Sequence, residues 1–161
     1  MTELGLNAGL RVEEMASLQH KHLFIEGDNS SIIVIGKGQK KRLVWLNSKF
    51  KSRCKSYIAL KKEQGFSCSE ESFLLNNLKD GKISKRSLQK FFKQILVKAG
   101  LPFFYHIHCL RHTYATFVLE VTNNDYKFLQ NQLGHASIKT TQIYAGIMVN
   151  KRRNDLERLY E

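Results

Sequence analysis

The chain has 161 residues, 42% of them hydrophobic, which suffices for one domain with a buried core but not for two domains of ordinary size. Lysine and arginine outnumber aspartate and glutamate by 26 to 14, so the formal charge is +12. That charge indicates a polyanionic partner, above all nucleic acid, although a basic surface that only contacts solvent would give the same count. An anionic membrane is a weaker alternative, because no basic segment carries a continuous apolar face.

The three cysteines, Cys54, Cys68 and Cys109, are odd in number and share no tight spacing. They give no support to a disulfide framework or a CxxC site, and they favour a reducing compartment. The first residues show no signal-peptide pattern, and no apolar run approaches the length of a membrane span. We therefore expect a cytoplasmic, nucleoid-associated protein with no membrane partner.

The first predicted element is a helix from Gly9 or Leu10 to about Leu18. Val12, Met15 and Leu18 recur at helical spacing, so they are expected to face inward.

Three short strands are predicted after this helix, over residues 23–25, 31–35 and 42–46. The segments between them, 27–29 and 36–38, contain glycine and have the composition of turns. Short apolar strands joined by brief turns are typical of an antiparallel meander.

Helical spacing returns in the second half of the chain. One helix is marked by Phe50, Cys54, Tyr57 and Ile58. A second begins after Ser84, a helix-capping residue, and is ended by Gly100. Its expected apolar stripe consists of Leu88, Phe91, Phe92, Ile95 and Ala99.

Two further helices are predicted over residues 109–121 and 125–133, the second ended by Gly134. Ser137 then caps a short helical turn that leads to Tyr144, and residues 149–160 form a polar helix that packs weakly on its own domain. The predicted fold class is a mostly helical α+β domain with a small three-stranded antiparallel sheet.

Several side chains in this sequence suit an attack on a phosphodiester without a metal ion. Such a reaction builds charge on the non-bridging oxygens, deprotonates a nucleophile and protonates the leaving oxygen. Arginine suits the first task, because its planar fork binds phosphate oxygens bidentately and stays charged. Arg11 and Arg111 are the candidates.

His108 lies three residues before Arg111, so both are expected on one helical face, with Leu110, Tyr114 and Phe117 in the core. An imidazole can donate to a phosphate oxygen or exchange protons near neutral pH. Taken alone, His108 is equally consistent with a helix cap or a core histidine.

Zinc is a rival interpretation of this segment, because four ligand types crowd seven positions: His106, His108, Cys109 and His112. The guanidinium of Arg111 among them would oppose a bound dication. No HExxH pattern or second His/Cys cluster completes a site, so the sequence favours no metal and no cofactor.

Tyr144 is the candidate nucleophile, and because a phenol is mostly protonated at neutral pH it needs cationic or imidazole neighbours. His135, nine residues earlier, is one candidate neighbour. Lys37 lies between two glycines in a predicted hairpin turn, where it can contact phosphate or protonate a leaving oxygen. Taken alone, Tyr144 is consistent with a core aromatic and Lys37 with a solvated hairpin tip.

The ordered combination of these segments resembles the catalytic domain of the tyrosine recombinases, which include phage integrases, Xer-type recombinases and integrases of conjugative transposons. Ala-Gly-Leu-Arg-Val-Glu-Glu at 8–14 resembles the first box, and Ile-Gly-Lys-Gly at 35–38 resembles the hairpin that carries a lysine. His-x-Leu-Arg-His-Thr-x-Ala-Thr at 108–116 and Leu-Gly-His-x-Ser-Ile-x-Thr-Thr-x-x-Tyr at 133–144 resemble the second and third boxes. The match extends over about 6–147.

The resemblance implies a role for each matching residue. It implies that four residues bind the scissile phosphate: Arg11, His108, Arg111 and His135. It implies that Glu14 supports them, that Lys37 is the general acid toward the 5′-oxygen, and that Tyr144 forms a 3′-phosphotyrosyl bond. Neither metal nor ATP is then required. A type IB topoisomerase-like enzyme and a non-catalytic basic DNA-binding module are the alternatives.

The resemblance also implies a homo-tetramer on double-stranded DNA, with the segment 147–161 docked on a neighbouring protomer. Two departures from the family pattern are visible. Ala8 stands where threonine is usual, and only ten residues precede Arg11. We therefore expect 1–161 to form the catalytic domain, with a separate N-terminal DNA-binding domain and the first catalytic-domain helix absent, and the free chain to be monomeric.

Overall fold

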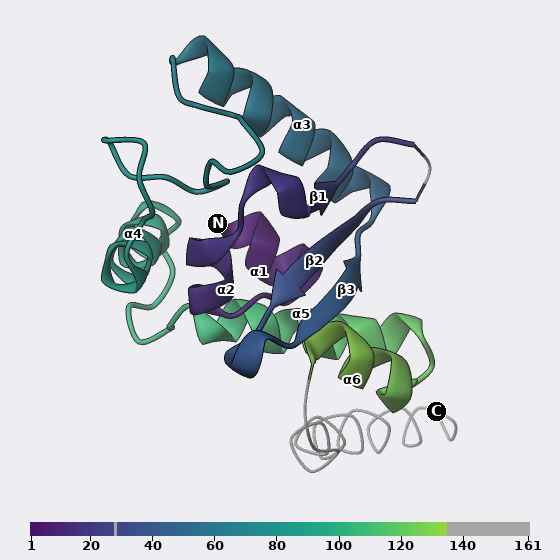
Figure 1. Ribbon diagram of the computed structural model, residues 1–161. Coiled ribbons are helices and arrows are strands. Elements are labelled where there is room, and N and C mark those ends of the chain that lie inside the picture. Colours follow the sequence, from purple (N-terminus) through teal and green to yellow (C-terminus); the bar gives the residue numbers. More distant parts are fainter. Residues whose placement is uncertain (28, 135–161) are drawn as a thin grey trace, which may run out of the picture.

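The computed structural model describes residues 1–27 and 29–134, apart from the side chain of Lys37 (Figure 1). His135, Tyr144, the predicted turn after Ser137 and the predicted tail helix lie outside the described residues. The described part contains six α-helices, two 3-10 turns and a three-stranded sheet. The predicted α+β class with a small antiparallel sheet is confirmed.

Two helices, not one, form the amino-terminal region. Residues for which no element was predicted form α1 (Thr2–Ala8), and the predicted first helix is the shorter α2 (Val12–Ser17). Gly9 separates them, because its φ of +60° ends α1 in the left-handed conformation, and Arg11 is extended before α2 begins. The inward positions of Val12, Met15 and Leu18 are confirmed, since all three are buried.

The predicted meander is confirmed in the strands β1 (Leu23–Phe24), β2 (Ser31–Ile35) and β3 (Lys41–Trp45), which pair antiparallel in that order. Ile32 pairs with Val44, and both are buried on the core face. Because side chains alternate along a strand, Leu43 and Trp45 point the other way, and both are exposed. A 3-10 turn, η2 (Lys37–Gln39), joins β2 to β3.

The next two helices, α3 (Ser48–Glu63) and α4 (Lys85–Lys98), are each capped by a side chain, and the Ser84 cap was predicted. The predicted stripe on α4 was partly wrong. Leu88 and Phe92 are buried, but Phe91 is 59% exposed and Ala99 is exposed, whereas Leu96 is buried. The buried residues recur every four positions and face α2, so the stripe is narrower than the spacing of apolar residues indicated.

The last two described helices are α5 (His108–Val121) and α6 (Tyr126–Leu133), and they lie side by side below the sheet (Figure 1). Leu110 and Tyr114 are buried as predicted, but Phe117 is 57% exposed, which corrects that prediction. The buried face of α5 packs on α1 and α6, and Phe117 lies outside it.

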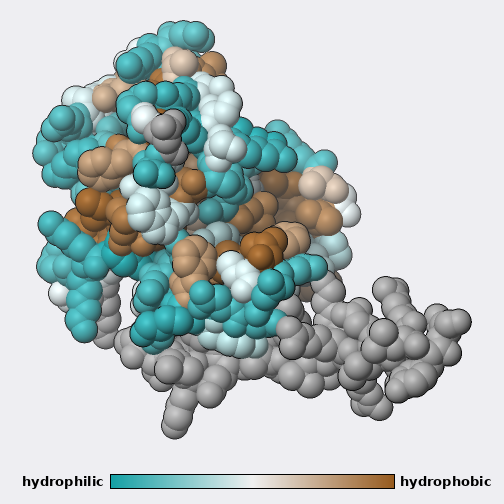
Figure 2. All heavy atoms as spheres, turned by 90° about the vertical axis from the view of Figure 1, so that its right-hand side faces the viewer, coloured by the Kyte–Doolittle hydropathy of each residue, from teal (hydrophilic) through white to brown (hydrophobic). Residues whose placement is uncertain are grey.

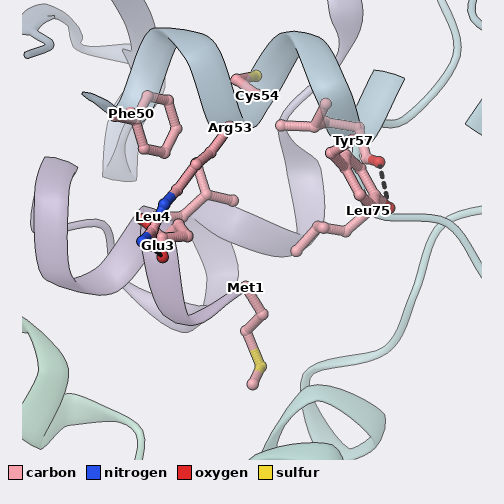
Figure 3. A pocket seen from close by; sticks show the side chains of 9 residues that line it. Met1, Glu3, Leu4, Phe50, Arg53, Cys54, Tyr57 and Leu75 are labelled. Carbon is pink, nitrogen blue, oxygen red and sulfur yellow. Dashed lines mark hydrogen bonds and ion pairs between the residues drawn. The ribbon is translucent and has the colours of Figure 1, made fainter. Parts of the chain in front are cut away.

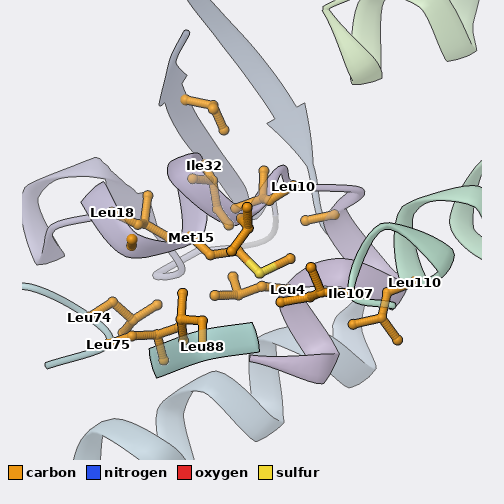
Figure 4. Close-up of a cluster of buried hydrophobic side chains, with 14 of the residues drawn as sticks. Leu4, Leu10, Met15, Leu18, Ile32, Leu74, Leu75, Leu88, Ile107 and Leu110 are labelled. Carbon is orange, nitrogen blue, oxygen red and sulfur yellow. The ribbon is translucent and has the colours of Figure 1, made fainter. Parts of the chain in front are cut away.

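The main core lies where α1, α2, the sheet, α4 and the start of α5 converge, around Met15 and Leu10 (Figure 4). A second cluster joins α5 to α6 through Leu119, Leu129 and Leu133. A small apolar pocket of about 120 Å³ remains between α1 and α3, with Phe50 and Tyr57 among its lining residues (Figure 3). None of the residues expected to do chemistry lines this pocket.

On the face shown in Figure 2, hydrophilic side chains dominate and apolar side chains form patches between them. No helix of the described part is long and apolar enough to span a bilayer.

Gly9 is the tightest glycine position in the core, and Gly65 provides a matched comparison. Both have positive φ, but a Cβ on Gly9 would lie 2.5 Å from Tyr114 Cδ1, whereas one on Gly65 would meet no atom within 4 Å. We therefore expect Gly9→Ala to lower the free energy of unfolding by about 2 kcal/mol or more, and Gly65→Ala by about 1 kcal/mol from backbone strain alone. Urea denaturation measures both, and equal losses would contradict the packing described.

Candidate active site

The carboxylate of Glu14 is the centre of the candidate site. Glu14 lies in the first turn of α2, and its side chain is only 5% exposed. Its Oε2 accepts a hydrogen bond from the backbone N–H of Arg11 at 2.7 Å, which is the reciprocal half of a capping box. Its Oε1 accepts a second bond from Arg11 Nη1 at 3.2 Å. Two residues of the first box, Arg11 and Glu14, are thus in direct contact.

A second arginine, Arg42 of β3, binds the same carboxylate bidentately. Arg42 Nη1 donates to Glu14 Oε1 at 2.7 Å and Arg42 Nη2 donates to Glu14 Oε2 at 2.9 Å. Its Nε donates to the backbone oxygen of Gln132 at 3.0 Å, near the end of α6. The side chain is 12% exposed. Sequence reasoning assigned Arg42 no role beyond the basic run of the hairpin.

Arg111 of α5 is the third guanidinium around Glu14. Its Nη1 lies 4.0 Å from Glu14 Oε2 and donates to the backbone oxygen of Gly9. Its Nη2 donates to the backbone oxygen of Leu133 at 2.8 Å. The side chain is buried, so Arg111 joins the turn between α1 and α2 to the end of α6.

These charges fix the ionisation state of Glu14. Burial alone would raise the pKa of Glu14. The hydrogen bonds and charge of Arg42, the Arg11 backbone N–H and the charge of Arg111 outweigh that effect and hold the pKa below its ordinary value. In the described part of the chain, three guanidinium groups therefore face one ionised carboxylate, so cations outnumber carboxylates among the groups that meet at Glu14. Such an excess favours a bound anion.

Arg11 is the most accessible of the three arginines. Its side chain is 38% exposed, compared with 12% for Arg42 and 7% for Arg111. The guanidinium of Arg11 therefore binds Glu14 through Nη1 and remains accessible to a ligand from solvent.

His108 begins α5 and is exposed. A hydrogen bond from Lys85 lowers the pKa of Glu13, and the charge of His108 adds to this effect. The imidazole of His108 therefore lies within electrostatic range of α2. His108 and Arg111 both lie in the first turn of α5, which begins one residue earlier than predicted, and of the two only Arg111 is buried. The other histidines of this segment lie nearby: the rings of His106 and His108 are 6.3 Å apart.

Two of the four residues that were considered as zinc ligands contact one another. His106 Nδ1 lies 2.8 Å from Cys109 Sγ, within hydrogen-bond distance. Within residues 1–27 and 29–134, no group of three or more His, Cys, Asp or Glu side chains is arranged to hold a metal ion.

The backbone of the Lys37 hairpin lies at the end of the sheet that borders α2. Gly38 has a φ of +69° within η2, and the N–H of Gly36 donates to the backbone oxygen of Lys40 at 2.9 Å. A pocket of about 290 Å³ lies between this hairpin and α2, and Glu14, Ile35 and Gln39 are among its lining residues. The hairpin backbone and Glu14 therefore border one cavity.

The structure thus brings together Arg11, Glu14 and Arg111, and the hairpin that carries Lys37 borders the cavity beside Glu14. His108 lies in the first turn of α5, three residues before Arg111. The predicted roles of His135 and Tyr144 fall on residues outside the described part. Arg42 was missed, although one signal was available: it lies two residues before Val44 and so occupies an inward position of β3.

Comparison with known proteins places the chain in a family. Residues 1–150 match the model of the phage integrase family, and the chain belongs to that family, which contains the tyrosine recombinases. It is 36% identical over 144 residues to tyrosine recombinase XerC of Salmonella typhi, an alignment that covers 89% of this chain and 46% of the relative. XerC of Escherichia coli O157:H7 is 37% identical with the same coverage.

Solved structures agree with this assignment. The XerH site-specific recombinase bound to a palindromic difH substrate, in a post-cleavage complex, has a TM-score of 0.81 and 26% identity, covering 99% of this chain and 45% of that one. The XerA recombinase has a TM-score of 0.76 and 29% identity, covering 88% and 50%. The chain spans about half the length of the curated relatives it matches.

Glu14→Gln is expected to destabilise the domain at neutral pH, because it removes the one carboxylate among three guanidinium groups. The expected loss is about 3 kcal/mol of unfolding free energy, the scale for breaking a buried ion pair. The folded-state pKa of Glu14 is depressed, so its contribution is present above the unfolded-state pKa and is lost as pH falls through the folded-state value. The difference between the variant and wild type should therefore narrow in acid.

Glu13→Gln is the matched control for this experiment. Glu13 is adjacent in sequence, but it is exposed and pairs with Lys85 at the surface, so its loss should change stability by no more than about 1 kcal/mol. Urea denaturation from neutral to acidic pH compares the two variants. Similar effects of both would show that Glu14 does not hold the cluster together.

Proposed function

We propose that this chain is the catalytic domain of a site-specific DNA recombinase, an integrase that cuts and rejoins DNA strands through a 3′-phosphotyrosyl intermediate without metal or ATP. The observation that carries the proposal is the cluster of three guanidinium groups around Glu14, two of which, Arg11 and Arg111, belong to the boxes that resemble those of the tyrosine recombinases. Family membership and the DNA-bound XerH structure support the same reaction and a DNA partner.

Arg11 and Arg111 bind the non-bridging oxygens of the scissile phosphate, and His108 donates to the same group. These groups stabilise the charge that develops in the transition state. Their hydrogen bonds to Glu14, Gly9 and Leu133 hold two guanidinium groups in position before the substrate arrives. Preorganised donors of this kind accelerate reactions because they need no rearrangement as charge develops.

Tyr144, Lys37 and His135 complete the reaction in this proposal. The phenolic oxygen of Tyr144 attacks phosphorus, and the bond from phosphorus to the 5′-oxygen breaks. Lys37 gives a proton to that leaving oxygen, while His135 supports the phosphate. One phosphodiester bond is exchanged for a phosphotyrosyl ester of similar energy, so the reverse attack by a 5′-hydroxyl reseals DNA without ATP. The order of these residues along the chain supports their roles.

The proposed partner is double-stranded DNA, bound mainly through its phosphates in keeping with the charge of +12. Affinity should then fall steeply with salt and vary little with sequence. The proposed assembly is a homo-tetramer on DNA, with a monomeric free chain, acting in the cytoplasm at the nucleoid.

Replacement of Tyr144 by phenylalanine tests the covalent step. A nicked duplex that traps the intermediate should give a protein–DNA adduct with the wild-type chain and none with Tyr144→Phe, because the attacking oxygen is removed. Denaturing electrophoresis measures the adduct, and a gel-shift assay should show unchanged DNA binding. An adduct of undiminished yield in this variant would exclude Tyr144 as the nucleophile.

The same assay separates the alternatives. A wild-type chain that binds DNA but forms no adduct is a non-catalytic binding module. Relaxation of supercoiled DNA without pairing of two duplexes indicates a topoisomerase-like enzyme. A chelator should leave the adduct yield unchanged, and activity restored only by added zinc or magnesium would contradict the metal-free reaction.

The proposed role of Lys37 is tested with a substrate whose 5′-leaving oxygen is replaced by sulfur, which leaves without a proton. Lys37→Ala should slow adduct formation on the ordinary substrate by about 100-fold or more, and this defect should largely disappear on the sulfur substrate. Lys40→Ala, which removes an equal charge from the same hairpin, is the control and should behave alike on both. If Lys37→Ala lowers the rate of adduct formation equally on the two substrates, Lys37 contacts the phosphate and is not the general acid.

A further inference from the structure

We propose that Arg42 is a positioning residue for this reaction: it holds the Glu14 carboxylate and the carboxyl end of α6 in fixed register with the hairpin. The inference rests on the proposed function and adds a residue that the boxes do not contain.

Arg42 is engaged by the protein through all three guanidinium nitrogens. Two of them bind the two oxygens of Glu14, and Nε binds the backbone oxygen of Gln132. The side chain is mostly buried, unlike that of Arg11, which remains open to solvent. The proposed function assigns the phosphate contacts to Arg11 and Arg111, the arginines of the first and second boxes. We infer that Arg42 acts instead through the groups it holds.

The first group that Arg42 holds is Glu14, on which Arg11 also depends. Arg11 Nη1 shares Glu14 Oε1 with Arg42 Nη1. Because Arg42 engages both carboxylate oxygens, it fixes the plane of the carboxylate and hence the direction in which Arg11 is held. A lysine has one nitrogen and cannot fix that plane.

The second group is the end of α6, where carbonyls have no partner within the helix. Arg42 Nε binds the oxygen of Gln132 and Arg111 Nη2 binds the oxygen of Leu133, and both cations suit the negative end of the helix dipole. Gly134 then turns with a φ of +63°, and a Cβ there would lie 2.6 Å from Arg42 Cδ. The helix end that precedes His135 is therefore built against Arg42.

The third connection runs along the backbone of Arg42 itself. Arg42 pairs with Val34 in the ladder, one pair inside Ile35 and Lys41, which adjoin the hairpin that carries Lys37. Anchoring β3 at Arg42 therefore sets the position of this hairpin relative to Glu14. One side chain thus links the first box, through Glu14, to the hairpin and to the helix end where the third box begins.

Glu14 gives this role a measurable signature. The charged groups that face it are Arg11 at the start of α2, Arg42 on β3 and Arg111 on α5, and His22 lines the adjoining pocket. The Arg42 hydrogen bond is the largest influence that lowers the pKa of Glu14 against burial. Without Arg42 that pKa rises, so Glu14 takes up a proton and releases Arg11 at a higher pH than in the wild type.

The test measures the rate of adduct formation against pH on the nicked substrate for wild type, Arg42→Gln and Arg42→Lys. We expect Arg42→Gln to reduce the rate at neutral pH by about tenfold or more and to move the acid limb of the profile to higher pH. The rate and the acid limb of Arg42→Lys should lie between those of the wild type and of Arg42→Gln, because a single lysine nitrogen replaces the two nitrogens that bind Glu14. Both variants should be impaired equally on the oxygen and sulfur substrates.

Lys41→Gln is the matched control, since it removes a positive charge from the adjacent, exposed position of the same strand. It should leave both rate and profile unchanged. Thermal denaturation identifies any variant that fails to fold. If Arg42→Gln does not fold, the comparison of Arg42→Lys with the wild type tests the proposal. In a Glu14→Gln background, Arg42→Lys should cause a smaller further loss than in the wild type, because the bidentate contact with Glu14 is already disrupted and mainly the contact with the Gln132 oxygen remains to be lost.

A slower rate with an unchanged acid limb would overturn the proposal, since it would show a purely structural role. A full rate and unchanged profile in Arg42→Lys would also overturn it, since charge alone would then suffice. Absence of any adduct with the wild-type chain would instead refute the proposed function, so the two failures are distinguishable.

Discussion

The rest of the site depends on one buried carboxylate, that of Glu14. Three guanidinium groups converge on it from α2, β3 and α5, and without it their charges would repel one another in a largely buried space. Burying an ion is costly unless it is paired and fully hydrogen-bonded. Both carboxylate oxygens of Glu14 accept two hydrogen bonds each, so that condition is met. The carboxylate acts as the common partner that lets cations from separate elements share one pocket.

The backbone supplies the remaining partners of the arginines. Arg111 donates to Gly9 at the turn between α1 and α2, and both Arg111 and Arg42 donate to carbonyls at the end of α6. Short helices expose such carbonyls at their ends, and here arginines fill the places that a longer helix or water would take. The same hydrogen bonds that satisfy the helix end therefore fix the directions of two cations. Fold stability and preorganisation of the site have one physical origin.

Local signals predicted most of the fold. The Ser84 cap, the Gly134 helix stop and the short apolar run at 31–35 between two turns were each sufficient to place an element. The failures concern contacts that local spacing cannot specify: Phe91 and Phe117 continue apolar stripes in sequence, but both are exposed and lie outside the buried faces of α4 and α5. The arginine roles of the first two boxes were predicted from motifs, whereas Arg42 was not, because its partners lie 28 and 90 residues away in sequence.

The charges around Glu14 bear on the proposed binding of DNA. Among the described residues, three guanidinium groups meet at one carboxylate, so a phosphate bound beside them would be attracted by these cations. A ligand that binds only the folded state stabilises it by mass action, and here the ligand also completes the electrostatic balance of the core. In the proposed function, the surplus of guanidinium groups over carboxylates in this part of the described structure therefore serves substrate binding, because it favours an anion that comes from outside the domain.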